Sequence, residues 1–215
     1  MSLDDFINQN IYGKIGRLLE IIIGKRITCK LNQHLYDIFG NDFTGWDYSG
    51  DLPDPEKIKI IREYHTNNPH CNIFVETGTF FGYTTFALKE AFKTCHTIEV
   101  DPWLFKKAKN KFNHYTNCIC YHGDSTKILP SLLPTIDAPI LYWLDAHYSG
   151  GITWYGDTKD PIMIELESIL KHKHILNSVI LIDDARTLNV DDIFALIRKT
   201  GLKITVEKDI IRVTP

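Results

Sequence analysis

The stretch Phe74-Val75-Glu76-Thr77-Gly78-Thr79-Phe80-Phe81-Gly82-Tyr83-Thr84-Thr85 decides the fold of this chain. Its apolar start predicts a strand, its two glycines predict a turn, and the residues from Tyr83 onward predict a helix. A strand followed by a glycine-containing turn and a helix is typical of a nucleotide-binding site. The spacing Gly78-x-x-x-Gly82 differs from the G-x-G-x-x-G turn that receives a pyrophosphate.

The carboxylate of Glu76 indicates what kind of ligand this turn binds. At short range it would repel a phosphate, whereas it suits a ligand with a cationic amine and no phosphate. S-adenosylmethionine is such a ligand. We therefore expect Glu76, Gly78, Gly82 and Thr84 to hold this cofactor.

From residue 72 onward, short apolar segments alternate with helical ones. This alternation predicts parallel strands with right-handed crossovers, that is, a doubly wound α/β sheet. The strands are expected at 72–76, 94–99, 118–121, 140–145 and 178–183, followed by a hairpin of 203–206 and 210–213. The helices are expected at 83–92, 103–112, 126–133, 161–172 and 191–199.

The first 70 residues form an N-terminal helical extension in this interpretation, and residues 71–215 form the cofactor-binding domain. Isoleucines and a leucine recur at helical spacing from Ile7 to Ile22, which predicts an amphipathic helix. This helix packs either against the main domain or against a second subunit, as in a homodimer. A second helix is expected from Pro55 to just before Asn67.

Composition narrows the class of protein. The 215 residues carry a formal net charge of −3, so no global basic excess favours nucleic acid as a partner. Five cysteines without a C-x-x-C motif indicate reduced thiols in a cytoplasm. The apolar run Ile21-Ile22-Ile23 is too short to span a bilayer. We expect a cytoplasmic protein without a membrane span.

Acidic residues close the predicted strands, and ligands of such sheets bind beyond the carboxyl ends of the strands. Glu99 lies about 20 positions after the glycine turn, where an acidic side chain accepts the ribose hydroxyls. Asp124 and Ser125 open the helix after the third strand. They either contact the adenine edge or cap the helix, and both roles are compatible.

Three motifs together resemble the class I S-adenosylmethionine-dependent methyltransferases. They are Glu76-x-Gly78-x-x-x-Gly82, Leu141-Tyr142-Trp143-Leu144-Asp145-Ala146-His147 and Val179-Ile180-Leu181-Ile182-Asp183-Asp184-Ala185. The last two are similar to motifs of the metal-dependent O-methyltransferases, both catechol-type and macrocin-type. The resemblance implies a seven-stranded sheet with an antiparallel last strand. It also implies Mg²⁺ held by Asp145, Asp183 and Asp184, which would lower the pKa of an acceptor hydroxyl.

One departure from the catechol-type pattern concerns the general base. A lysine stands three residues after the Asp of the fourth strand in that group, whereas this chain has Tyr148. His147 and Asp145 are the remaining candidates for taking the proton of the hydroxyl. The segment 148–158 is expected to form the acceptor pocket because it is long, glycine-rich and aromatic.

The sequence therefore predicts an S-adenosylmethionine-dependent methyltransferase that modifies a hydroxyl of a sugar, a glycan or another small molecule with the help of Mg²⁺. Two alternatives stay open. One is a catalytically inactive binding or assembly protein with the same fold. The other is a metal-dependent hydrolase that uses the aspartate cluster.

Overall fold

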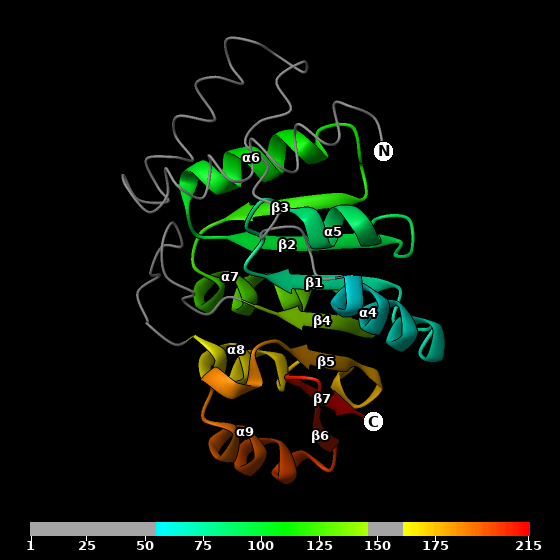
Figure 1. Cartoon of the computed structure of the whole chain (residues 1–215), viewed down its shortest axis with the longest axis vertical. Coiled ribbons are helices and arrows are strands. Elements are labelled where there is room, and N and C mark those ends of the chain that lie inside the picture. Colours follow the sequence, from blue (N-terminus) through cyan, green and yellow to red (C-terminus); the bar gives the residue numbers. More distant parts are fainter. Residues whose placement is uncertain (1–54, 146–160) are drawn as a thin grey trace, which may run out of the picture. The chain divides into compact units, whose positions relative to one another are not determined.

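The computed structural model describes residues 55–145 and 161–215 of the chain (Figure 1). Its strands are β1 (Ile73–Thr77), β2 (Thr94–Glu99), β3 (Cys118–His122), β4 (Ile140–Leu144), β5 (Val179–Ile182), β6 (Lys203–Glu207) and β7 (Ile210–Thr214). Its α-helices are α4 (Pro55–Asn67), α5 (Tyr83–Leu88), α6 (Pro102–Phe112), α7 (Ser125–Leu132), α8 (Ile162–Ile169) and α9 (Val190–Ile197).

The seven strands form one sheet in the order β3-β2-β1-β4-β5-β7-β6. Strands β1 to β5 pair in parallel, while β7 runs antiparallel to both β5 and β6. Because β1 to β5 are parallel, their carboxyl ends lie at one edge of the sheet, and the strand order reverses direction between β1 and β4. The predicted doubly wound, mostly parallel sheet with an antiparallel last strand is confirmed.

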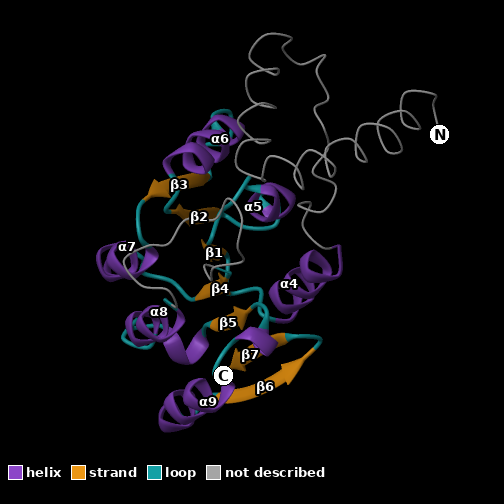
Figure 2. Ribbon diagram, turned by 60° about the vertical axis from the view of Figure 1, so that its left-hand side comes forward, coloured by secondary structure: helices purple, strands orange, loops and turns teal. Residues whose placement is uncertain are grey.

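Each face of the sheet has its own core layer. On β4, Tyr142 and Leu144 belong to a cluster with α7, α8 and α9, and Leu141 and Trp143 belong to a cluster with α4, α5 and α6. This division follows from the alternation of side chains along a strand. Figure 2 shows α7 and α8 on one side of the sheet and α4 and α5 on the other.

Helix α5 is shorter than the sequence predicts. It ends at Leu88 and not at Phe92, because the N–H of Ala91 closes a turn on the carbonyl of Leu88 at 2.8 Å. The N–H of Lys93 then bonds to the carbonyl of Asn72, at 2.8 Å, as the chain enters β2. Pairing with the start of β1 therefore replaces the last turn of the expected helix.

Helix α4 shares the core of the sheet through Ile60 and Ile61, which lie in one cluster with Phe74 of β1. The division of the chain near residue 70 stays a prediction. The expected first helix, His147 and the segment 148–158 lie outside the described residues. No helix among those described is both long enough and apolar enough to cross a membrane.

Gly82 allows close packing of the turn against α6. A Cβ at this position would lie 2.7 Å from Cζ of Phe112, and the φ of Gly82 is 74°. We expect Gly82→Ala to lower the free energy of unfolding by about 3 kcal/mol, because a left-handed φ and a core clash add together. Urea unfolding measures this loss.

Gly201→Ala is the matched control for this prediction. Gly201 also has a positive φ, 82°, but nothing lies within 4 Å of its added Cβ. It should lose only about 1 kcal/mol, the cost of the backbone conformation. Equal losses in the two variants would contradict the proposed clash with Phe112.

Candidate active site

The turn between β1 and α5 is closed by backbone hydrogen bonds. The N–H groups of Gly78 and Thr79 donate to the carbonyl of Ile98 on β2, at 3.1 and 3.2 Å, and the N–H of Gly82 donates to Thr79 at 2.8 Å. Gly78 and Gly82 have φ angles of 81° and 74°, which glycine adopts without a steric cost. The two predicted cofactor glycines therefore shape the turn where β1 ends.

Glu99 joins the end of β2 to this turn. Its Oε2 accepts the N–H of Phe80 at 2.7 Å, and its Oε1 accepts the N–H of Asp101 at 2.8 Å. Phe80 has a φ of 51°, a left-handed conformation that is costly for a bulky residue. The bond to Glu99 helps to hold this residue in place, and both carboxylate oxygens have lone pairs for further donors, such as ribose hydroxyls.

The carboxylate of Glu76 lies beneath the turn among threonine hydroxyls. It is only 1% exposed, and its Oε2 accepts the hydroxyls of Thr85 and Thr97 at 2.7 and 2.6 Å. Thr84 adds a further hydrogen bond. Burial raises the pKa of Glu76 to about 7, and it raises the pKa of Glu99 to about 7 as well. Direct contact between Glu76 and a cofactor amine stays a prediction.

The raised pKa of Glu76 predicts a pH-dependent stability. The pKa rises from the usual 4.5 to about 7, so the folded chain holds this proton more tightly than the unfolded chain does. The contribution of Glu76 to stability is therefore complete at low pH and is lost as the pH rises through about 7. Relative to Glu76→Gln, wild type should lose on the order of 2 to 3 kcal/mol between about pH 5 and pH 7.5.

Urea unfolding without ligand, at a series of pH values, measures this difference. The Gln variant keeps an amide oxygen that accepts the threonine hydroxyls but has no proton to release. Parallel pH profiles for the two proteins would show that the Glu76 carboxyl has the same pKa in the folded and unfolded chains.

Asp124 caps the helix that follows β3. Its Oδ1 accepts the N–H and the hydroxyl of Thr126 at 2.9 and 2.6 Å, as an N-cap does. Ser125 is the first residue of α7 and is buried. Of the two roles expected from the sequence, capping is the one that the structure contains. Contact of Asp124 or Ser125 with an adenine ring stays a prediction.

Asp145, Asp183 and Asp184 follow β4 and β5, and Lys57 from α4 lies close to them. The Nζ of Lys57 is 2.5 Å from Oδ2 of Asp183 and 3.7 Å from Oδ1 of Asp184. Burial acts to lower the pKa of Lys57, but the hydrogen bond to Asp183 and the charges of the three carboxylates outweigh it and raise the pKa. One ammonium thus serves as a counter-charge for all three predicted metal ligands.

Asp145 lies in a less polar and more negative environment than a surface carboxyl. Burial, and then the charge of Asp183, raise its pKa well above the usual value, while the charge of Lys57 opposes this rise. The backbone N–H of Asp145 donates to the carbonyl of Thr77 at 3.0 Å. This bond fixes Asp145 beside the end of β1, and so beside the glycine turn.

A bound Mg²⁺ requires about six oxygen ligands at about 2.0–2.1 Å. Oδ1 of Asp183 accepts the N–H of Asp184 at 2.9 Å, and Oδ1 of Asp184 lies 3.8 Å from Nη2 of Arg186. Within 55–145 and 161–215, no three His, Cys, Asp or Glu side chains are placed to hold a metal ion. In this arrangement the carboxylates fit an ammonium and not Mg²⁺, so magnesium at Asp145, Asp183 and Asp184 stays a prediction.

Solved structures share this architecture. An O-methyltransferase from Bacillus cereus, solved with S-adenosylhomocysteine, matches with a TM-score of 0.58, 16% identity and coverage of 86% of this chain and 97% of its own. TomG from Streptomyces achromogenes, an O-methyltransferase of tomaymycin synthesis solved with S-adenosylmethionine, matches at 0.57 and 19%, covering 76% and 82%. The strand order and these matches agree. The chain has the class I methyltransferase fold.

A Staphylococcus aureus protein provisionally assigned as a caffeoyl-CoA O-methyltransferase matches this methyltransferase fold at a TM-score of 0.59 and 14% identity, covering 90% of this chain and all of its own. No protein-family model and no curated protein matches the sequence. Similarity at these identities establishes the fold and not the chemistry.

Within the methyltransferase fold, sequence reasoning missed Lys57 and the threonines that surround Glu76. Lys57 is the third residue of α4, and a cation in the first turn of a helix opposes the helix dipole. This unfavourable position of a lysine in the first turn of a helix was the feature of the sequence that could have pointed to a role for Lys57. Thr85 and Thr97 gave no comparable signal, because Thr97 comes to Glu76 from a neighbouring strand.

Proposed function

We propose that this chain is an S-adenosylmethionine-dependent methyltransferase that modifies a hydroxyl oxygen of a small molecule. The observation that carries the proposal is Glu99, whose carboxylate closes β2 and also bonds the N–H of Phe80 in the glycine turn. A carboxylate in that place accepts ribose hydroxyls. The buried carboxyl of Glu76 below the turn disfavours the binding of phosphate. This distinguishes the site from those that bind the pyrophosphate of a dinucleotide.

Each cofactor residue has a physical role in this proposal. Gly78 and Gly82 let the backbone approach the ligand, Thr84 helps to hold Glu76, and the Glu76 carboxylate gives the turn its negative potential. Glu99 binds the ribose. Asp124 and Ser125 position the start of α7 beside the adenine.

S-adenosylmethionine supplies an activated methyl group when it is bound. The residues of the chain hold the acceptor oxygen in line with that group and exclude water. Asp145 takes the proton of the acceptor hydroxyl, so that its oxygen could accept the methyl group that the bound cofactor would supply. We favour Asp145 over His147 as the base because the bond from the Asp145 N–H to the carbonyl of Thr77 places Asp145 beside the glycine turn.

A sugar, a glycan or another small hydroxyl compound is the acceptor in this proposal. Magnesium-assisted transfer remains one form of it, and the contact between Lys57 and Asp183 favours a form in which the protein supplies the cation. A cytoplasmic location and a homodimer through the N-terminal helix expected from Ile7 to Ile22 are further parts of the proposal.

The proposal is tested by incubating the chain with S-adenosylmethionine and a panel of catechol, caffeate and methyl glucoside, and by measuring S-adenosylhomocysteine formation. We expect product formation with at least one hydroxyl compound. Binding without turnover across a broad hydroxyl panel would favour the inactive binding protein. Hydrolysis of a phosphate ester or amide without cofactor would favour the hydrolase.

A further inference from the structure

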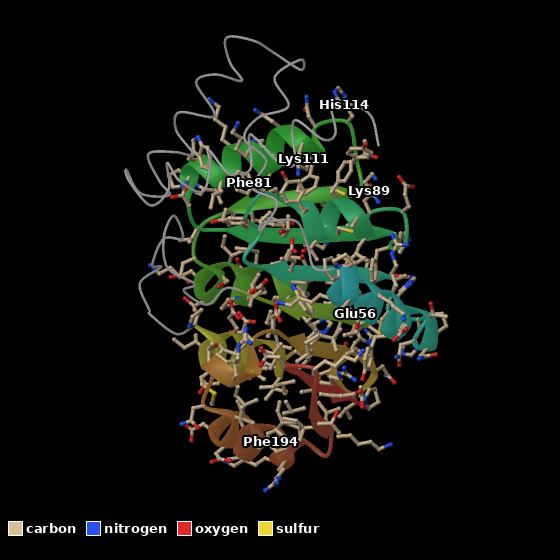
Figure 3. The ribbon with its side chains drawn as sticks, in the orientation of Figure 1. Glu56, Phe81, Lys89, Lys111, His114 and Phe194 are labelled. Atoms are coloured by element: carbon tan, nitrogen blue, oxygen red, sulfur yellow. The ribbon has the colours of Figure 1, made fainter. Side chains whose placement is uncertain are left out.

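Lys57 is fixed in place because α4 is fixed at several points along its length. Ile60 and Ile61 are buried in the core. Arg62 donates to the carbonyl of Ala87 at 2.7 Å, and Lys208 donates to Glu56 at 2.9 Å. Figure 3 labels Glu56 at the start of α4. The helix therefore presents Lys57 to the aspartates from a rigid element.

The aspartate cluster needs a cation of its own. The side chain of Asp183 is 2% exposed, and a buried carboxylate without a partner is strongly destabilising. Lys57, at 32% exposed, meets that carboxylate directly, whereas Lys59 on the same helix is 68% exposed and pairs with Glu63 at 3.9 Å. The position of Lys57 opposes the helix dipole, and the aspartates offset this cost.

We propose that Lys57 is the resident cation of the acceptor site, and that its ammonium takes the place expected for a divalent metal. The inference rests on the proposed methyltransferase function. One N–H of the ammonium is bonded to Asp183, and an ammonium has two more donors, which hold the acceptor oxygen. Its charge stabilises the negative charge that develops on that oxygen as the proton leaves. Methyl transfer then requires no divalent metal.

Metal binding tests this proposal without any acceptor. The chain is titrated with MnCl₂, free Mn²⁺ is measured by electron paramagnetic resonance, and thermal unfolding is followed with and without millimolar MgCl₂. We expect wild type to bind no Mn²⁺ at this cluster. Lys57→Met, which keeps the length of the side chain and removes its charge, should gain one Mn²⁺ site and a rise in unfolding temperature with MgCl₂.

Two further variants separate the charge from its surroundings. Lys57→Arg keeps the positive charge and should bind no Mn²⁺, and Lys59→Met removes a lysine from the exposed face of the same helix and should behave as wild type. A wild-type Mn²⁺ site that disappears in Asp183→Asn would overturn the proposal. A folded Lys57→Met that gains no site would also overturn it, and if that variant does not fold, the wild-type titration decides.

Turnover gives a second readout once an acceptor is found. Wild-type turnover should be unchanged by EDTA, and Lys57→Met should lose about 100-fold, the effect of removing one donor to a developing charge. Loss of wild-type turnover in EDTA with recovery in MgCl₂ would overturn the inference and leave the proposed function intact. Failure to bind S-adenosylmethionine would instead overturn the proposed function, while the Mn²⁺ comparison would still test the role of Lys57.

Discussion

Glu99→Ala is expected to raise the Kd for S-adenosylmethionine by at least about 100-fold, which corresponds to about 3 kcal/mol. The variant removes the proposed acceptor of the ribose hydroxyls, and charge-assisted bonds of this kind contribute about 1.5–3 kcal/mol each. It also releases the N–H of Phe80, so the turn loses a bond that fixes its strained residue. Isothermal titration calorimetry measures the change in affinity.

Glu90→Ala is the matched control for this variant. Glu90 is an acid on the segment after α5, its side chain is 85% exposed, and it pairs with Lys89 at 3.8 Å. Its removal should change the Kd by less than about twofold, because exposed ion pairs contribute little. Thermal unfolding of Glu99→Ala confirms that the variant is folded. Unchanged cofactor affinity in a folded Glu99→Ala would contradict the assignment of the ribose site.

Asp145→Asn is expected to lower kcat by about 1,000-fold and to leave the Kd for the cofactor within about twofold. A general base contributes roughly 10²–10⁴ to a rate, and the amide has no basic oxygen with which to accept the proton. The backbone bond from residue 145 to Thr77 does not involve the side chain, so the geometry near the turn should persist. Single-turnover kinetics with an identified acceptor measure the loss.

His147→Ala separates the two candidates for the base. It should lose much less activity than Asp145→Asn. Asp191→Asn, on the exposed surface of α9, should keep wild-type turnover. Suppose instead that His147→Ala loses about 1,000-fold in kcat and Asp145→Asn keeps wild-type turnover. The base would then be His147.

Local sequence patterns were sufficient to predict where the strands of the sheet lie. Strand β4 begins at Ile140 as expected and ends at Leu144, because an apolar run between polar turns encodes a buried strand. The place of Glu99 beside the glycine turn followed from topology, since the carboxyl ends of neighbouring parallel strands share one edge. The predicted end of α5, Phe92, was wrong. After Leu88 the chain turns so that the N–H of Lys93 bonds to the carbonyl of Asn72, and a local sequence pattern does not reveal such a contact between distant residues.

Contacts between distant parts of the chain could not be predicted from the sequence. Lys57 and Asp183 are 126 positions apart, and neither belongs to a motif that names the other. Only packing of α4 on the sheet brings them together. The clash that a side chain at Gly82 would cause with Phe112 has the same origin. Strand-end positions and the family resemblance predicted the acids proposed for the site, and tertiary packing supplied their counter-charge.

Titration of the 215-residue chain with S-adenosylmethionine tests the central claim most directly. We expect binding of one cofactor per chain, with a Kd in the micromolar range typical of enzyme substrates, and a rise in the unfolding temperature through linkage. An absence of both heat and thermal shift, with and without MgCl₂, would contradict the assignment of this site to S-adenosylmethionine.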